Sequence, residues 1–291
     1  MEQSMAERLN KVLARAGVAS RRGADTLIEQ KRVTVNGKVA ELGQSVTPGV
    51  EEIRVDGELV RVAGIPDRHF AFYKPRHVIS TASDPYDRPT VVDFIDSNVR
   101  LFPVGRLDGA SEGLMLLTND GDMAHRLIHP RYEHEREYRV KISGTPLESV
   151  LQKWREGMWL GEERTQPTEI SVESSSGGST WLRWVMREGK NRQIRRMVEA
   201  LSHEVHELIR IRMGPITLGT LKPGEWRRLT LEEIAALDAG SDEPIYATGD
   251  RYFDADHDAD GTPKKKAYKK GWARPKPRRN TRPRGGKRGR K

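Results

Sequence analysis

The strongest constraint on what this chain can fold into is the uneven spread of charge along it. Residues 264–291 carry 15 Lys or Arg and no acid, whereas residues 238–260 carry eight acids and one Arg. Neither segment shows apolar periodicity, so neither can bury enough surface to offset the entropy of ordering the chain. We therefore predict that 238–291 is a disordered tail, acidic and then basic, and that the folded domains lie within 1–237.

The basic part of the tail interleaves Tyr268 and Trp272 with its cations. A solvated tail that only aids solubility is one interpretation, but an uninterrupted basic arm of this kind favours electrostatic attraction to RNA. Contacts of this type release counterions and read no sequence. The arm is therefore expected to raise affinity without selecting a site.

Composition excludes several classes of protein. None of the 291 residues is a cysteine, which rules out disulfide frameworks, thiolate zinc sites, iron–sulfur clusters and cysteine nucleophiles. The first 20 residues lack an apolar core of signal-peptide length, and no run of about 18 apolar residues occurs. We expect a monomeric cytoplasmic protein without a membrane partner.

The first predicted domain is a small basic module. Apolar residues recur at helical spacing over 8–16 and again after Ser20, which can cap the second helix by accepting a backbone N–H. Alternating valines around Asn36 and Gly37 then predict a hairpin with a tight two-residue turn. The pattern indicates two helices followed by a hairpin.

This module is rich in cations, with eight Lys or Arg and two acids between residues 8 and 40. Solvated helix faces can look like this, but several of the cations fall at or beside helix ends and turns, where one phosphate-binding surface could form. These candidates for RNA binding are Arg15, Arg21, Arg22, Lys31 and Arg32.

The run RLNKVLARAGVASRRGADTLIEQKRVTVNGKVA, continuing to about Val55, resembles an S4 RNA-binding domain. The resemblance implies that the two helices and the hairpin face structured RNA. We place this domain at residues 8–56. Residues 57–68 contain Gly and Pro without periodicity, and they are predicted to be a linker.

The larger middle domain, residues 69–237, alternates short strands with a few helices. The segments HFAFY, REYRVKI, TWLRWVM and ELIRIRM show the period-two alternation of strands with one wet face. Helices are expected near 120–128, 147–156 and 192–201. This pattern predicts an α+β fold with a mixed, mainly antiparallel sheet, in contrast to the unbroken apolar strands of doubly wound parallel folds.

The usual motifs for cofactors and metals do not occur in this domain. There is no G-x-G-x-x-G, P-loop or H-E-x-x-H. Isolated histidines such as His129 and His134 are expected at the surface or in loops rather than as metal ligands. We predict a site that uses neither a cofactor nor a metal.

Asp108 is the first candidate for chemistry. The segment FPVGRLDGASEGLMLLTNDGD approaches as an apolar strand, exposes Arg106 and Asp108 after Gly105, and re-enters an apolar run. From spacing alone, an ordinary turn aspartate that bonds its own backbone is the favoured interpretation. Further on, Asp120 and Asp122 look like caps and turn residues at the start of the next helix, with Asp122 a possible N-cap.

Tyr138 is the second candidate. In EREYRVKI, strand alternation places Tyr138 on one face together with Val140 and Ile142, and the charged residues on the other. Tyr138 therefore points toward the core or a cleft. Judged from this segment alone, a core tyrosine is favoured.

The third candidate is the helix predicted in REGKNRQIRRMVEAL, where Asn191 can act as the cap. Arg192, Arg195 and Arg196 then share one side, opposite the apolar side chains. A solvated basic face is one interpretation. Guanidinium groups gathered beside a glycine, however, suit a phosphate or carboxylate.

With FYKPRHVIST at 72–81 and GPITLGTLKPGEWRRLT at 214–230, these segments resemble the pseudouridine synthases of ribosomal RNA that carry an N-terminal S4 domain. G-R-L-D, S-x-G-L, E-R-E-Y and E-G-x-N-R-Q-I-R-R-M occur in that order, and the resemblance spans residues 8 to about 235. RLIHP followed by EREYRV is closer to the large-subunit type than to the small-subunit type. One departure is Ser111, where the family often has Thr; the hydroxyl is retained.

The resemblance implies roles for individual residues. Asp108 becomes the catalytic aspartate, Arg195 its partner, and Tyr138 the ring stacked on the extruded base. Arg106 becomes the side chain that enters the RNA helix, and Arg192 and Arg196 join it as RNA-binding residues.

The resemblance also implies an isomerase that converts a uridine of rRNA, with 23S rRNA favoured over 16S rRNA, either naked or in a pre-ribosomal particle. The reaction needs an ionised carboxylate near the ribose, and a nearby guanidinium lowers an aspartate's pKa and keeps it ionised. Two other classes stay open. A non-catalytic ribosome-binding or assembly protein would need only the S4 domain and the tail, and a metal-dependent nuclease would need clustered carboxylates.

Overall fold

The computed structural model describes residues 6–62 and 66–246. The acidic and basic tail predicted from the sequence lies outside these residues from 247 onward, so that part stays a prediction. None of the helices in the described ranges has the length and apolar character that a bilayer crossing needs.

The N-terminal module (residues 6–62) has the predicted helix–helix–hairpin order. Ser20 caps the second helix by accepting the backbone N–H of Gly23 at 3.0 Å. Asn36 and Gly37 both have positive φ, as the tight turn requires. Its elements are α1 (Leu9–Arg15), α2 (Arg21–Glu29), the antiparallel sheet β3 (Lys38–Val39), β2 (Val33–Val35), β5 (Ile53–Val55) and β6 (Glu58–Leu59), and the pair β1 (Glu7–Arg8) and β4 (Ser45–Val46).

One detail of this module differs from the prediction. The predicted linker contains β6, which pairs with β5, and Val60 and Val62 pack against the module's core. The sequence did not predict this short strand, because a strand of two residues is too short to show an alternating pattern. We propose the domain boundaries on this basis, with the module extending to about residue 62.

The larger domain is built on a nine-stranded mixed sheet, which confirms the predicted α+β class. Within the described residues only β15 and β9 run parallel, and the other neighbours are antiparallel. The path along the sheet is β13 (Glu169–Ser176), β14 (Ser179–Met186), β10 (Arg136–Ser143), β15 (Val205–Met213), β9 (Glu112–Thr118), β7 (His69–Lys74) and β17 (Trp226–Arg228), with β16 (Ile216–Thr217) on β15 and β8 (Phe102–Val104) on β9.

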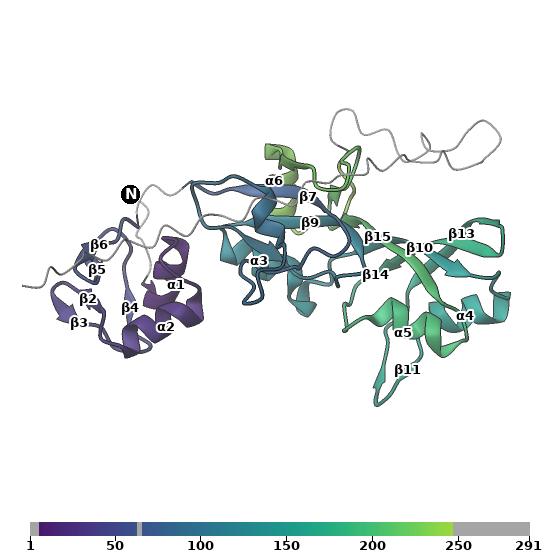
Figure 1. The fold of residues 1–291 in the computed structure, drawn as a ribbon, viewed down its shortest axis with the longest axis horizontal. Coiled ribbons are helices and arrows are strands. Elements are labelled where there is room, and N and C mark those ends of the chain that lie inside the picture. Colours follow the sequence, from purple (N-terminus) through teal and green to yellow (C-terminus); the bar gives the residue numbers. More distant parts are fainter. Residues whose placement is uncertain (1–5, 63–65, 247–291) are drawn as a thin grey trace, which may run out of the picture. The chain divides into compact units, whose positions relative to one another are not determined.

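Helices cover both faces of this sheet. Helices α4 (Glu148–Glu156) and α5 (Gln193–Ala200) lie on one face of β10, β14 and β15 (Figure 1) and contribute Trp154, Ile194 and Met197 to the main core. Helices α3 (Gly121–Ile128) and α6 (Leu231–Asp238) belong to a second core, with Met123 and Leu237. The remaining elements are the short helices η1 (Val91–Phe94) and η2 (Pro130–Tyr132) and the hairpin β11 (Trp159–Leu160) and β12 (Glu163–Arg164).

The predicted helices are present, but the caps of two of them lie one or two residues from the position that was preferred. Asp120, not Asp122, caps α3, because its carboxylate accepts the backbone N–H groups of Asp122 and Met123. Arg192, not Asn191, occupies the cap position of α5, and its backbone is left-handed. Local sequence allows each neighbouring polar residue as a cap, and helix ends are defined only to within one or two residues.

The predicted tail begins too early. Residues 239–246 pack on the larger domain: Arg212 Nη1 donates to the Asp242 carbonyl at 3.0 Å, and the Ile245 N–H donates to the Pro215 carbonyl at 2.8 Å. His134 is 3% exposed, and its Nδ1 lies 2.8 Å from Asp242, so this histidine is buried rather than at the surface. Counting charges along the sequence could not predict these contacts, because the residues that bind 239–246 lie about 30 or more positions earlier in the chain.

Candidate active site

A cleft with a volume of about 680 Å³ opens on the face of the sheet that α5 covers. Three segments line it, drawn from residues 79–81, 105–111 and 186–194, and Tyr138 and Leu208 form part of its wall. Within the described residues, the cleft therefore brings together the segments of Asp108, Tyr138 and Arg192, which the sequence singled out as candidates for chemistry.

Asp108 lies on the turn between β8 and β9, and several hydrogen bonds hold that turn. The Ser80 hydroxyl bonds both the carbonyl and the N–H of Leu107, at 2.7 and 3.1 Å. The His77 N–H donates to the Gly109 carbonyl at 2.6 Å, and the Ser111 N–H donates to the Asp108 carbonyl at 3.2 Å. These contacts fix the backbone around the carboxylate, so Asp108 is presented from a rigid turn.

Arg195 is the main partner of the Asp108 carboxylate. Its Nε donates to Asp108 Oδ2 at 3.2 Å, and its Nη2 donates to Ser111 Oγ at 3.0 Å. Arg192 Nη1 lies 3.6 Å from the same Oδ2. Two guanidinium groups from α5 and its cap thus face one carboxylate from the β8–β9 turn.

The electrostatics of this cluster keep Asp108 ionised. Partial burial by itself would raise the pKa of Asp108, but the Ser111 hydroxyl, Arg195 and Arg192 together lower it below its usual 3.8. The side chain keeps 22% of its surface exposed to the cleft. Asp108 can therefore act as a permanent anion within reach of a ligand.

Arg195 does not lie on a solvated face, as one interpretation of the sequence had it. Its side chain is 8% exposed, because α5 turns it inward against the β8–β9 turn and toward the Val205 carbonyl. Arg192 is 46% exposed and lines the cleft. Arg196 lies outside the cleft lining and donates to the Leu160 carbonyl at 2.8 Å. The three arginines thus have three different environments.

Strand alternation left core and cleft open for Tyr138 and the segment alone favoured the core; Tyr138 belongs to the main core and also lines the cleft. It is 8% exposed and contributes to the cleft wall beside Ile194 and Leu208. On the opposite face of β10, Glu137 is also buried, because Arg183 and Arg212 bind its carboxylate at 2.7 and 3.0 Å. The charged face of this strand was predicted to be wet and is instead closed by ion pairs.

Arg106 is exposed and lines the cleft two residues before Asp108. Its position suits a side chain that reaches toward a ligand. In the N-terminal module, Arg21, Arg22 and Lys31 are exposed. Arg15 pairs with Glu7 at 3.0 Å, and Arg32 donates to both carboxylate oxygens of Asp56 through Nε and Nη2. Arg15 and Arg32 therefore already hold acidic partners within the module.

Lys74 is a residue near the site that the sequence did not single out. It is fully buried, and its Nζ donates to the carbonyls of Ser111 and Pro75 at 2.8 and 3.0 Å. Burial lowers its pKa to about 8, although Asp108 and Glu112 act in the other direction. The available signal was a lysine closing the apolar strand HFAFYK, where a buried cation needs partners.

Gly113 lets two strands approach directly behind the aspartate turn. Its φ is +107°, and a Cβ built there would lie 2.3 Å from the Arg210 carbonyl oxygen on β15. This is the point at which β9 and β15 form their short parallel pair. Arg210 is itself 2% exposed, and its Nε donates to the Leu114 carbonyl at 2.7 Å.

The geometry defines what the site can do. An ionised carboxylate, an exposed arginine and an aromatic wall surround a cleft that can admit a planar ring with its attached sugar. Within the described residues, no group of three or more His, Asp or Glu is arranged to hold a metal ion. The carboxylate itself is the candidate reactive group.

Comparison with known proteins identifies both domains. Residues 7–51 match the S4 domain, and residues 68–200 match the family described as RNA pseudouridylate synthase. The chain is 43% identical over 241 residues to ribosomal large subunit pseudouridine synthase B of Bacillus subtilis (strain 168), covering 81% of this chain and 97% of the relative. The protein of that name from Salmonella typhimurium is 42% identical, covering 80% and 82%.

Two further relatives agree. An uncharacterised RNA pseudouridine synthase of Aquifex aeolicus (strain VF5) is 39% identical, covering 80% of this chain and 94% of the relative. A crystal structure described as pseudouridylate synthase superposes with a TM-score of 0.58 at 30% identity, covering 79% of this chain and 99% of that chain.

An S4 domain joined to a domain whose cleft presents an arginine-held aspartate defines an RNA-modifying enzyme. The comparisons narrow this class to one reaction type. The chain belongs to the RNA pseudouridine synthase family, whose members are isomerases. The resemblance inferred from the motifs is therefore confirmed at the level of the family.

Proposed function

We propose that this enzyme converts a uridine of 23S ribosomal RNA to pseudouridine, with Asp108 as the catalytic carboxylate. The observation that carries the assignment is a cleft lined by Asp108 and Tyr138, in which the buried Arg195 binds the Asp108 carboxylate. Preference for the large-subunit RNA is supported by the names of the relatives from B. subtilis and S. typhimurium. The enzyme is proposed to act as a cytoplasmic monomer on naked rRNA or on a pre-ribosomal particle.

The reaction balances without an added reactant. The bond from C1′ to N1 of uridine breaks, the uracil turns in the cleft, and a bond forms from C1′ to C5. The proton lost from C5 is replaced by one gained at N1. Asp108 can attack C1′ or remove the proton from C2′, and both routes use a carboxylate that Arg195 keeps ionised.

The target base must first leave the RNA stack, which costs a few kcal/mol. Arg106 is proposed to occupy the space that the base leaves, and Tyr138 to support the extruded ring from the cleft wall. Arg192 is proposed to bind a phosphate at the cleft edge, since its side chain is half-exposed. Arg196 is a weaker candidate, because Leu160 already accepts its hydrogen bond.

The N-terminal module is proposed to dock the enzyme on structured RNA. Of its five candidate cations, Arg21, Arg22 and Lys31 are exposed and are the stronger ones. The basic segment 264–291 is proposed to add attraction that does not depend on sequence.

The test of the catalytic assignment is tritium release from rRNA transcripts that carry 5-tritiated uridine. Asp108→Asn and Asp108→Ala should release no tritium while still binding the RNA. The exposed Asp96→Asn is the matched control and should behave as wild type. Release retained by Asp108→Ala would defeat the assignment.

Two further experiments test the alternative functions, a metal-dependent nuclease and a non-catalytic assembly protein. A metal-dependent nuclease would shorten the RNA and stop in EDTA, whereas the synthase should leave RNA length unchanged and work in chelator. Mapping pseudouridines in 23S and 16S rRNA from a deletion strain would identify the substrate, since one missing position names it. A full complement of pseudouridines would favour the non-catalytic assembly protein.

A further inference from the structure

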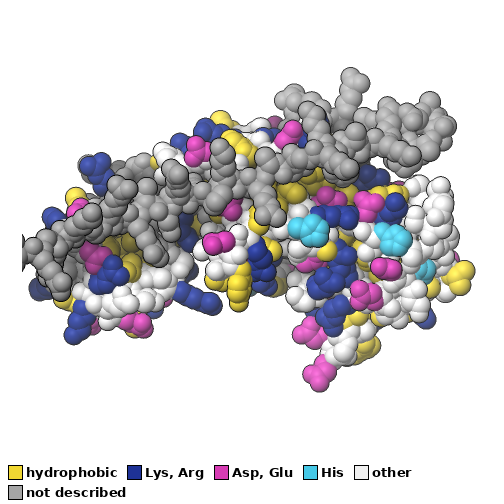
Figure 2. All heavy atoms as spheres, in the orientation of Figure 1, with side chains coloured by type: hydrophobic (Ala, Val, Ile, Leu, Met, Phe, Trp, Pro, Cys, Tyr) yellow, Lys and Arg dark blue, Asp and Glu magenta, His cyan; other side chains and the backbone are white. Residues whose placement is uncertain are grey.

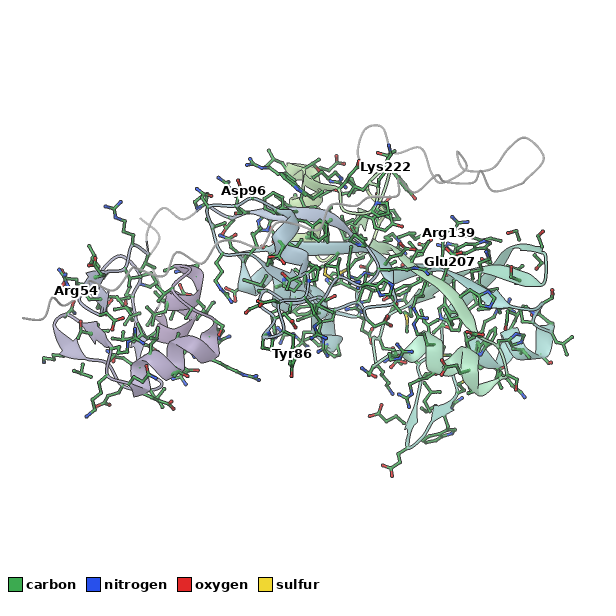
Figure 3. The ribbon with its side chains drawn as sticks, viewed as in Figure 1. Arg54, Tyr86, Asp96, Arg139, Glu207 and Lys222 are labelled. Carbon is green, nitrogen blue, oxygen red and sulfur yellow. The ribbon has the colours of Figure 1, made fainter. Side chains whose placement is uncertain are left out.

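A tyrosine on the loop after the cleft wall is unusually exposed. Residues 79–81 line the cleft, and the chain continues from them into a loop that carries Tyr86. Tyr86 is 77% exposed, and Figure 3 shows it projecting outward from the loop. Five residues of extended chain span at most about 17 Å, so Tyr86 lies within that distance of Thr81.

The loop holds this tyrosine in one position. The Asp84 side chain is 4% exposed, and its carboxylate accepts the backbone N–H of Tyr86 at 3.0 Å and that of Arg88 at 3.2 Å. The Arg88 guanidinium also donates to Asp84, at 2.7 and 3.1 Å. Chiefly because of these bonds from Arg88, the pKa of Asp84 is lowered to about 2, so the Asp84 carboxylate is ionised at any physiological pH.

The same arginine also lies against the tyrosine ring. The Arg88 guanidinium carbon is 5.2 Å from the centre of the Tyr86 ring, and the Arg88 side chain is 53% exposed. The planar guanidinium of Arg88 and the ring of Tyr86 are thus held together and stay exposed, on a loop whose backbone Asp84 binds. Two of the four hydrogen bonds fix the backbone beneath the tyrosine, and the other two fix the guanidinium beside its ring.

Stacking on a nucleobase is the interaction that such a pair suits best. Unpaired bases in RNA stack on aromatic rings and on guanidinium planes, and a preordered ring loses little entropy when it binds. Asp84 neutralises Arg88, so net charge contributes little here and the ring faces contribute most. The location beside the cleft points to a base close to the one that enters it.

We propose that Tyr86 and Arg88 form a stacking platform for an unpaired nucleotide that flanks the extruded uridine. This inference rests on the proposed function, because it needs an RNA strand that passes through the cleft. The platform holds the neighbouring base after the target has left the stack and so compensates part of the stacking lost on extrusion. It therefore contributes to binding of the RNA and not to the chemical step.

The experiment measures tritium release against RNA concentration, with unmodified 23S and 16S rRNA transcripts as probes. Tyr86→Ala should raise the half-saturating RNA concentration about tenfold and leave kcat within about twofold of wild type. Tyr86→Phe and Tyr86→Trp keep a ring and should restore tight binding. Because stacking is lost rather than a phosphate contact, the ratio between wild type and Tyr86→Ala should change little with salt.

A matched control comes from the opposite face of the sheet. Trp181 lies beneath Arg139, whose guanidinium carbon is 4.9 Å from its ring, and it pairs with Lys141 on the face of β10 away from Tyr138. Figure 2 shows Lys and Arg side chains interspersed with Asp and Glu on the part of one face that is in view, and Figure 3 labels Arg139 and Glu207 on strands β10 and β15. Trp181→Leu should leave RNA binding unchanged.

A second readout is ultraviolet crosslinking of the Asp108→Ala protein to transcripts that contain 4-thiouridine. Crosslinked peptides should include Tyr86, and the crosslink should be lost in Tyr86→Ala. The platform is overturned if Tyr86→Ala binds as wild type, if Tyr86→Phe is as weak as Tyr86→Ala, or if Trp181→Leu weakens binding equally. Tritium release by Asp108→Ala would instead overturn the proposed function itself, so the two failures are distinguishable.

Discussion

Arg195 donates from Nε to Asp108 Oδ2 at 3.2 Å, across 87 positions of sequence. This single contact joins the β8–β9 turn to helix α5, which form two sides of the cleft. The guanidinium is almost entirely buried, so water screens the pair weakly. The ionisation of the carboxylate and the geometry of the cleft thus depend on the same side chain.

Replacing Arg195 by Gln should move the acid limb of the pH–rate profile upward. In wild type, Asp108 has a pKa below 3.8 and stays ionised above it. Without Arg195, the raising effect of burial is less opposed, so the carboxylate takes up its proton at higher pH. We also expect kcat to fall by about 100-fold at neutral pH, measured by tritium release. Arg196→Gln, which removes the same charge next along the helix, should keep the wild-type profile.

Gly113→Ala should destabilise the larger domain by about 3 kcal/mol or more. The added Cβ would lie 2.3 Å from the Arg210 carbonyl oxygen, in a backbone conformation that alanine adopts with strain. Urea unfolding followed by circular dichroism measures the change. Gly121→Ala meets no atom within 4 Å and should change stability by less than about 1 kcal/mol. Equal losses in both variants would contradict the close approach of β9 and β15.

Lys74 should make stability rise with pH in the alkaline range. Its pKa is about 8 in the folded protein against 10.5 for the free side chain, so between these values the unfolded chain binds more protons at this residue. The gain from about pH 8 to pH 10.5 is at most about 3 kcal/mol. The stability difference between wild type and Lys74→Met should grow over this window. For Lys222→Met, at an exposed position, the difference should stay constant.

Deleting residues 264–291 should weaken RNA binding without affecting the chemical step. The segment carries 15 cations, so its removal reduces the number of counterions released on binding. We expect a higher half-saturating RNA concentration, a shallower dependence of affinity on salt, and an unchanged kcat. A tail of equal length made of Gly and Ser separates charge from chain length. If kcat falls with the deletion, the tail has a role in the reaction that charge alone does not explain.

Local pattern was enough to predict the elements that carry the site. Alternation in EREYRVKI grouped Tyr138 with Val140 and Ile142 on the face of β10 that borders the core and the cleft, and Asn36–Gly37 predicted the hairpin turn. Both signals depend on backbone geometry within a few residues. Asp120 was named as a cap or turn residue but Asp122 was preferred, and the cap position at Arg192 was missed, because neighbouring polar side chains were equally acceptable to local rules.

The sequence by itself determined the α+β class, the basic N-terminal module and the motifs that identify the family. The family resemblance also implied Arg195 as the partner of Asp108. Only the tertiary structure decided how differently Arg192, Arg195 and Arg196 are buried, why Lys74 and Arg210 are buried behind the turn, and where Tyr86 is displayed. Helix periodicity grouped Arg192, Arg195 and Arg196 as equals. Their environments diverge because the order of strands in the sheet brings α5 against a turn formed more than 80 residues earlier, and no local pattern encodes that pairing.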